Sequence, residues 1–238
     1  MIRLGNLLFR YRDFIFPAAF LILVFGTRPH PLFGNKYLDI WMDALGMTIA
    51  LAGQILRALV IGFAYIRRGG KNKQIYADRL VQEGFFAHCR NPLYLGNFMI
   101  VLGLGIVANS VWFYMVGIPF FIAGYTAIIM AEEDFLRRRF GKEYEEYCQR
   151  VNRFIPNFKG LQTSLQGMAF NWKRLISKEY GTTFTWMACT LLLMIWERYY
   201  DPHYQAQRAE IIGISLLFIP LVFAYATARY LKKTGRLH

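Results

Sequence analysis

The chain has 238 residues, of which 55% are hydrophobic and 17% aromatic, and it carries a formal net charge of +13. Soluble domains are also about half apolar, so the clustering of these residues is more informative than their total. Residues 111–131 and 211–228 contain no charged side chain. Runs of about 18–25 such residues match the ~30 Å apolar core of a bilayer. The sequence therefore predicts a polytopic membrane protein and argues against an ordinary soluble domain.

The predicted fold class is all-α, with about six transmembrane helices. We expect the spans at residues 13–27, 44–66, 93–108, 111–131, 183–196 and 211–228. The third and fourth spans are joined only by Asn109 and Ser110, which predicts a tight antiparallel hairpin. Pro119 and Pro220 lie inside spans and predict local kinks, because proline lacks the N–H that the helix needs.

The positive charges alternate from loop to loop. Lys and Arg number three in 1–12, six in 67–90, ten in 132–183 and four in 229–238, against two each in 28–40 and 197–210. This asymmetry follows the positive-inside rule and predicts that both termini are cytoplasmic, in a bacterial inner membrane. Because topology accounts for the basic excess, nucleic acid is not an expected partner.

Two segments after the fourth span have helical periodicity. In 132–158, aromatic and aliphatic residues recur at mostly helical spacing, with an interruption at Gly141. In 161–178, apolar residues form one stripe and the basic residues lie off it, which is typical of a helix lying in the membrane interface. Two roles fit such a helix: to capture lipid, or to anchor a linker. We expect a membrane core over 1–182 and a C-terminal transmembrane hairpin over 183–238.

The sequence motifs that carry chemistry converge on the cytoplasmic side. "GFFAHCRNPLYLGN" covers residues 84–97, "GLG" covers 103–105, and "FGKEYEEYCQRVNRFIP" covers 140–156. Glu132 and Glu133 end the fourth apolar run. Since the third and fourth spans form a hairpin, the Arg90–Tyr94 region and the glutamate pair are expected to emerge side by side. Cys89, Cys148 and Cys189 lack metal or redox spacing, so they are expected to be apolar fillers and no metal site is predicted.

These motifs resemble those of the isoprenylcysteine carboxyl methyltransferase and phospholipid methyltransferase superfamily of integral membrane enzymes. The resemblance covers about 84–158. Arg90, Pro92, Tyr94 and Gly96 match its first element, and Glu132, Glu133, Phe140, Gly141, Tyr144, Tyr147, Arg153 and Pro156 match its last. Asn91 stands where the superfamily pattern has histidine. Residues 127–131 are apolar where the prenylcysteine enzymes carry an arginine, which argues against a prenylcysteine substrate.

The resemblance implies S-adenosylmethionine as methyl donor and S-adenosylhomocysteine as product. The donor carries a sulfonium and an ammonium cation, so carboxylates suit it. The implied cofactor-binding residues are His88, Arg90, Asn91, Pro92, Tyr94, Gly103, Gly105, Glu132, Glu133, Tyr144, Tyr147, Arg153 and Pro156. The arginines would clamp the cofactor carboxylate, the glycines would allow close approach, and the tyrosines would close a lid. Arg57, Arg90 and Glu133 are the predicted catalytic residues.

Each of these residues also has a structural alternative. The glutamates can begin a solvated helix, the glycines can serve helix packing, His88 can be a solvated loop residue, and the aromatic series can form a core. Arg57 lies inside the second span, with Gln54 one turn earlier. An ionisable residue at that depth predicts a functional site, here for an acidic lipid head group. A snorkelling or internally paired arginine is the alternative.

The predicted function is methyl transfer at the membrane interface to a lipid or lipid-linked acceptor. O-methylation of a carboxylate or phosphate is favoured over N-methylation of an amine head group. Two alternatives stay open: an NADPH-dependent enzyme similar to membrane sterol reductases, and a non-catalytic membrane scaffold. The paired glutamates favour the methyltransferase, because a cationic cofactor needs acidic partners whereas a phosphate-bearing cofactor needs basic ones.

Overall fold

The computed structural model describes residues 1–26, 36–63, 68–71, 74–200 and 208–237. Three helical stretches are long and apolar enough to cross a membrane: Leu38–Phe63, Phe113–Phe140 and Arg208–Lys233. Pro92–Ala108 is a shorter apolar helix. The all-α prediction is thus confirmed for the described residues, apart from one small hairpin. Residues 28–35 of the loop predicted over 28–40, residues 64–66 of the predicted second span and residues 201–207 of the 197–210 loop lie outside the described residues, whereas residues 36–40 form part of a helix.

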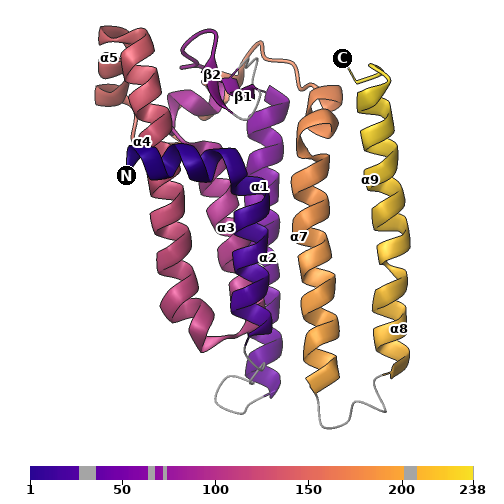
Figure 1. The fold of residues 1–238 in the computed structure, drawn as a ribbon. Coiled ribbons are helices and arrows are strands. Elements are labelled where there is room, and N and C mark those ends of the chain that lie inside the picture. Colours follow the sequence, from indigo (N-terminus) through magenta and orange to yellow (C-terminus); the bar gives the residue numbers. More distant parts are fainter. Residues whose placement is uncertain (27–35, 64–67, 72–73, 201–207, 238) are drawn as a thin grey trace.

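The helices form an elongated bundle (Figure 1). α1 (Ile2–Phe25) packs against α4 (Ile118–Phe140), and α2 (Lys36–Phe63) packs along α3 (Pro92–Ala108). Glycines allow the second pair to approach closely, because a Cβ on Gly53 would lie only 2.6 Å from the carbonyl oxygen of Gly96. Small residues at such contacts are typical of helices that pack within membranes.

Asn109 and Ser110 form the turn between the third and fourth helical stretches, as predicted. Asn109 adopts the left-handed conformation, with φ of 42°, and ends α3. A π-helical turn, Phe113–Gly117, precedes Pro119, so the helix is irregular next to this proline. α4 then continues through both glutamates to Phe140. Gly141, with φ of +52°, separates it from α5 (Lys142–Arg150).

The first part of α1 crosses α4 before the helix turns to run along the bundle (Figure 1). Gly5 lies at this crossing, where a Cβ would be 2.0 Å from the carbonyl oxygen of Ala127. The helix contains Pro17, which removes one main-chain hydrogen bond at the bend. This arrangement brings the basic N-terminal segment to the end of α4 that carries the glutamates.

The predicted continuous helix over 161–178 is wrong. The structure contains α6 (Leu161–Leu165) and then a break before α7 (Trp172–Tyr200). Gly167 in the break has φ of +78°, a conformation that a right-handed helix cannot include. The apolar periodicity of 161–178 predicted a continuous helix because it took no account of the backbone conformation of Gly167. α7 runs without interruption through the predicted domain boundary at 182.

Helices α7 and α9 form the remaining side of the bundle. α8 (Arg208–Leu216) leads into α9 (Phe218–Lys233), and the break at Leu217 lies three residues before Pro220, whose missing N–H leaves the preceding turn irregular. The Arg208–Lys233 stretch has a mean hydropathy of 2.2, yet only 6% of its apolar window is buried. An apolar helix with so much exposed surface is suited to contact with lipid rather than water.

Short elements that were not predicted lie between α2 and α3. β1 (Arg68–Lys71) and β2 (Gln74–Ala77) form an antiparallel hairpin, in which Gly69 pairs with Tyr76. A 3₁₀ turn, Gly84–Ala87, follows and leads into α3. These elements and α5 lie at the same end of the bundle (Figure 1). They cover the end at which the sequence motifs meet.

Candidate functional site

Glu133 is the centre of a buried ionic cluster. Only 3% of its surface is exposed. Arg153 donates two hydrogen bonds to its carboxylate, of 3.2 Å from Nε and 2.6 Å from a terminal nitrogen. Asn91 donates a third, of 3.3 Å, and a terminal nitrogen of Arg90 lies 3.8 Å away. A carboxylate this deep needs such partners to remain charged, and here it ties α4 to the start of α3 and to the segment after α5.

Glu132 faces a different neighbour. The hydroxyl of Tyr94 donates a 2.7 Å hydrogen bond to its carboxylate, which brings residues of α3 and α4 together as predicted. Arg12 of α1 donates to the same hydroxyl at 3.3 Å. Unlike Glu133, Glu132 lines a large cavity. The two consecutive glutamates therefore lie on different sides of one helix and contact different neighbours.

The cavity lies between α1, α3, α4, α7 and α9 and has a volume of about 730 Å³. Sites for small molecules and cofactors typically measure roughly 300–1,000 Å³. Its walls combine aromatic and apolar residues with many polar and charged ones. Of the predicted site residues, it is lined by Arg57, Arg90, Asn91, Pro92, Tyr94 and Glu132.

Arg90 lines this cavity and has one buried donor without a partner among the described residues. One terminal nitrogen donates to Sγ of Cys148 at 2.5 Å, but its buried Nε has no hydrogen-bond partner in the described part of the chain. A buried donor without a partner is costly, so a ligand acceptor at this position would stabilise the site. An open guanidinium donor and a carboxylate on one cavity fit the zwitterionic methionine end of S-adenosylmethionine.

His88 ties two loops together, outside the cavity lining. Its Nδ1 donates to the carbonyl oxygen of Asn157 at 2.5 Å, and the hydroxyl of Ser164 donates to its Nε2 at 2.9 Å. The backbone N–H of Arg90 donates to the carbonyl oxygen of Asn152 at 2.9 Å. These bonds dock the segment after α5 onto the start of α3. Half-buried Pro156 lies in this docked segment.

Tyr144 and Tyr147 form a packed core beside the cavity rather than part of its wall. Each is only 1% exposed, and both pack with Leu80 and Leu136. The hydroxyl of Tyr147 donates a 2.7 Å hydrogen bond to the carbonyl oxygen of Phe86. Burial, with the nearby Glu133 carboxylate, raises the pKa of Tyr144, so its hydroxyl stays neutral. The tyrosines hold α5 against the motif loop, which is the core role that the sequence left open.

Gly103 and Gly105 serve helix packing. A Cβ on Gly103 would lie 2.3 Å from the carbonyl oxygen of Gly46, and one on Gly105 would lie 1.7 Å from the ring of Phe113. Neither glycine lines the cavity, so the surroundings of both match helix packing, the alternative to cofactor binding. Burial raises the pKa of the Cys89 thiol, and all three cysteines, each in the described part of the chain, are free.

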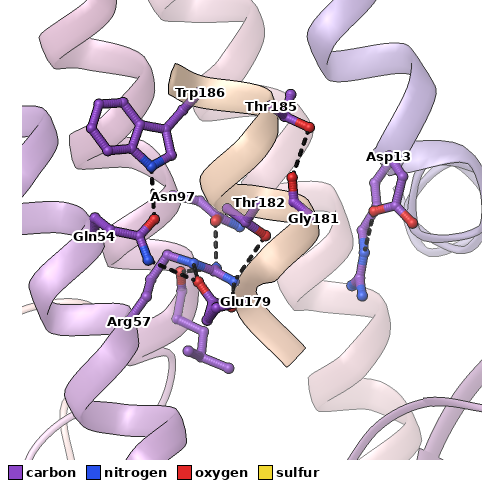
Figure 2. A network of polar contacts seen from close by, with 11 residues as sticks. Asp13, Gln54, Arg57, Asn97, Glu179, Gly181, Thr182, Thr185 and Trp186 are labelled. Carbon is purple, nitrogen blue, oxygen red and sulfur yellow. Dashed lines mark hydrogen bonds and ion pairs between the residues drawn. The ribbon is translucent and has the colours of Figure 1, made fainter. Parts of the chain in front are cut away.

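Arg57 is internally paired (Figure 2). It is 8% exposed, and it donates to Glu179 of α7 at 2.9 Å from Nε and at 2.5 Å from a terminal nitrogen. Its other terminal nitrogen donates to Asn97 at 2.5 Å. Gln54 bonds both Glu179, at 3.3 Å, and Trp186, at 2.8 Å. The arginine thus joins α2, α3 and α7 at the cavity wall, and its catalytic role stays a prediction.

Several cavity residues were not predicted from the sequence: Arg12, Tyr125, Lys178, Trp186 and Lys232. They come from α1, α4, α7 and α9, outside the recognised motifs. Glu179 was also missed, although a signal existed. Arg57 inside an apolar span requires a carboxylate at similar depth, and Glu179 is the one acidic residue near the start of the fifth apolar run.

The chain is similar to known proteins over about half of its length. Residues 42–143 match the family model described as phospholipid methyltransferase. The nickel-cobalt-cadmium resistance protein NccN of Alcaligenes xylosoxydans xylosoxydans is 32% identical over 129 residues, which are 51% of this chain and 55% of that protein. The cobalt-zinc-cadmium resistance protein CzcN of Cupriavidus metallidurans is 34% identical over 115 residues, 48% of each chain.

A third relative carries the methyltransferase name. Protein-S-isoprenylcysteine O-methyltransferase B of Arabidopsis thaliana is 28% identical over 125 residues, 49% of this chain and 60% of that protein. The chain spans about half the length of the curated relatives it matches. No solved structure matches it. Over residues 42–143, the chain is therefore similar to the phospholipid and isoprenylcysteine methyltransferases.

Proposed function

We propose that the chain is an S-adenosylmethionine-dependent methyltransferase that acts at the membrane interface on a lipid or lipid-linked acceptor. One observation carries the proposal: the Glu132 carboxylate and the partly unbonded Arg90 guanidinium line the same cavity. The cofactor has cations and a carboxylate close together, so it needs both kinds of partner. The family supports the same chemistry.

The residues divide the work of holding the cofactor. Bound S-adenosylmethionine supplies an electrophilic methyl group. Glu132 meets a cation of the cofactor, and Arg90 donates to its carboxylate. Glu133 already accepts two bonds from Arg153, so it orders the arginines rather than contacting the cofactor directly. Alignment of the two reactants is the main catalytic contribution, and it supplies at most about 7–11 kcal/mol in well-aligned cases.

The acceptor binds on the apolar part of the cavity. Phe16, Phe20 and Trp186 line this part and suit an acyl or isoprenoid chain. An oxygen acceptor is favoured, since a carboxylate or phosphate needs no general base, whereas an amine must first lose a proton. N-methylation of an amine head group is the second option.

The proposed topology has six spans: α1, α2, α3, α4, α7 and the α8–α9 stretch. Both termini and the motif loops lie in the cytoplasm, where the water-soluble cofactor enters, and the membrane is the bacterial inner membrane. The distribution of Lys and Arg supports this orientation. The two bacterial relatives support the bacterial setting.

Isothermal titration of the purified chain tests the cofactor. We expect binding of S-adenosylhomocysteine and no binding of NADPH. Binding of NADPH alone would favour the reductase alternative, and binding of neither would favour the scaffold. Incubation of membranes with the donor carrying a radiolabelled methyl group, followed by fractionation of the lipid extract, then identifies the acceptor.

A further inference from the structure

Two lysines of the C-terminal helices line the cavity on the side of α7 and α9. Lys178 belongs to α7 and Lys232 to α9, and Nζ of Lys232 lies 4.9 Å from the centroid of the Tyr180 ring. Neither lysine forms an ion pair with an acidic residue in the part of the chain that the structure describes. Both lie outside residues 42–143, the region that matches the family.

The other cations on the cavity already have partners. Arg57 pairs with Glu179 at 2.5 Å, and Arg90 bonds Cys148 and lies near Glu133. Arg12 lies 3.7 Å from the carboxylate of Asp13 and bonds Tyr94. The unbonded donor of Arg90 is assigned to the cofactor carboxylate, and the two lysine ammonium groups are the cavity cations that lack an acidic partner in the described part of the chain.

An aromatic wall continues from the lysines. The Tyr225 ring of α9 lies 5.2 Å from the ring of Tyr180 and 4.6 Å from that of Phe184, so it joins α9 to α7. Trp186 lies further along α7 on the same cavity. The start of α7 and the end of α9 lie at the end of the bundle that also carries α5 (Figure 1). The lysines thus lie at the motif end, and the apolar residues lie deeper.

We infer that Lys178 and Lys232 bind the phosphate of a lipid head group, while the aromatic wall holds its chain. Lysine binds phosphate as a compact point charge, whereas arginine binds either phosphate or carboxylate with its planar fork. The inference deepens the proposed function, and it rests on that function for the lipid's role as methyl acceptor. It also assigns a role to the C-terminal helices, which select the acceptor for a cofactor site built elsewhere.

Binding of amphiphiles to the full chain tests this inference. The protein is purified in dodecyl maltoside, which has no phosphate, and titrated with dodecyl phosphate, dodecyltrimethylammonium and inorganic phosphate. The variant K178Q/K232Q removes both cavity charges. The matched control K173Q/K233Q removes two exposed charges from the same helices, at positions off the cavity.

We expect K178Q/K232Q to bind dodecyl phosphate about tenfold or more weakly, because two charge-assisted contacts are lost. The control variant should bind as the wild type does. Dodecyltrimethylammonium should not bind, and inorganic phosphate should bind more weakly than the amphiphile. Equal losses in both variants, or equal binding of the cationic amphiphile by the wild type, would overturn the inference.

Titration with S-adenosylhomocysteine separates this inference from the proposed function. K178Q/K232Q should retain the wild-type affinity, because Glu132 and Arg90 are unchanged. A wild-type chain that binds dodecyl phosphate through the lysines but fails to bind S-adenosylhomocysteine would refute the methyltransferase and leave the phosphate site standing. A wild-type chain that binds S-adenosylhomocysteine but does not bind dodecyl phosphate through the lysines would refute the phosphate site alone.

Discussion

Glu132 and Glu133 illustrate how adjacent residues of one type acquire different roles. Glu133 is enclosed by Arg153, Asn91 and Arg90, whereas Glu132 accepts from Tyr94 and lines the cavity. A change of either carboxylate to an amide keeps the shape and removes the charge. The two changes should therefore affect cofactor binding and structural integrity differently.

The variant E132Q should bind S-adenosylhomocysteine about tenfold or more weakly, since one charged contact is lost. It should melt near the wild-type temperature, because its carboxylate has fewer partners in the protein. Titration calorimetry and thermal melting measure the two effects, with the exposed E145Q as control. Unchanged affinity in E132Q would contradict its role as counter-ion.

The variant E133Q should lower the melting temperature, because Arg153 and Arg90 then lose their buried counter-charge. Breaking a buried pair by removing one partner costs about 3–5 kcal/mol. Limited proteolysis should also show faster cleavage within 150–157, the segment that Arg153 helps to dock. A variant with wild-type melting and cleavage would show that the ion pair does not hold this segment.

The motif residues of the site could be predicted from the sequence, but their geometry could not. The meeting of Tyr94 with Glu132 followed from the two-residue turn between their helices. The different roles of Glu132 and Glu133 could not be predicted, because they depend on which side of α4 each neighbouring residue occupies. Motif reasoning could not predict Arg12, since it belongs to α1, outside the recognised motifs.

At the scale of elements, the bond from Arg57 to Glu179 fastens α7 to the α2–α3 pair. The network that it belongs to also includes Gln54, Asn97 and Trp186 (Figure 2). Because Lys178 is the residue next to Glu179, this network also sets the position of the proposed phosphate site. The C-terminal helices are thus held by polar bonds as well as by packing.

The variant E179Q should destabilise the protein by about 3–5 kcal/mol, because it leaves Arg57 buried without its counter-charge. The double variant R57M/E179M should recover part of this loss. Unfolding in denaturing detergent measures both. D134N, which removes the partner of the exposed Arg138, is the control and should cost less than about 1 kcal/mol. Equal effects of E179Q and D134N would contradict the fastening role.

The elements with long uncharged runs were predictable, and those with mixed composition were not. Residues 111–131 and 211–228 indicate helices through their length alone, and both lie in helical stretches. The 161–178 stripe misled, because Gly167 breaks it in a left-handed conformation. The hairpin of β1 and β2 is short, and its four-residue strands give too little alternation to be recognised.

The proposed topology is testable on the whole molecule. In a chain with all three cysteines changed to alanine, new exposed cysteines are introduced at Gln162, Ala209 and Arg236. We expect a membrane-impermeant maleimide to label Q162C and R236C in inverted vesicles, and A209C in right-side-out vesicles. Labelling of Q162C and A209C from the same side would contradict the six-span arrangement.

The rotation of α4 has a consequence for changes in its length. Successive side chains on an α-helix project about 100° apart. A single residue inserted between Gly124 and Ala131 would turn the acidic pair by that angle relative to Gly124, which packs against Phe16 of α1. Both glutamates would then face the wrong neighbours, although the composition would hardly change. An insertion of seven residues would nearly restore the direction, but it would move the pair about 10 Å along the helix axis, so it too would separate the glutamates from their partners.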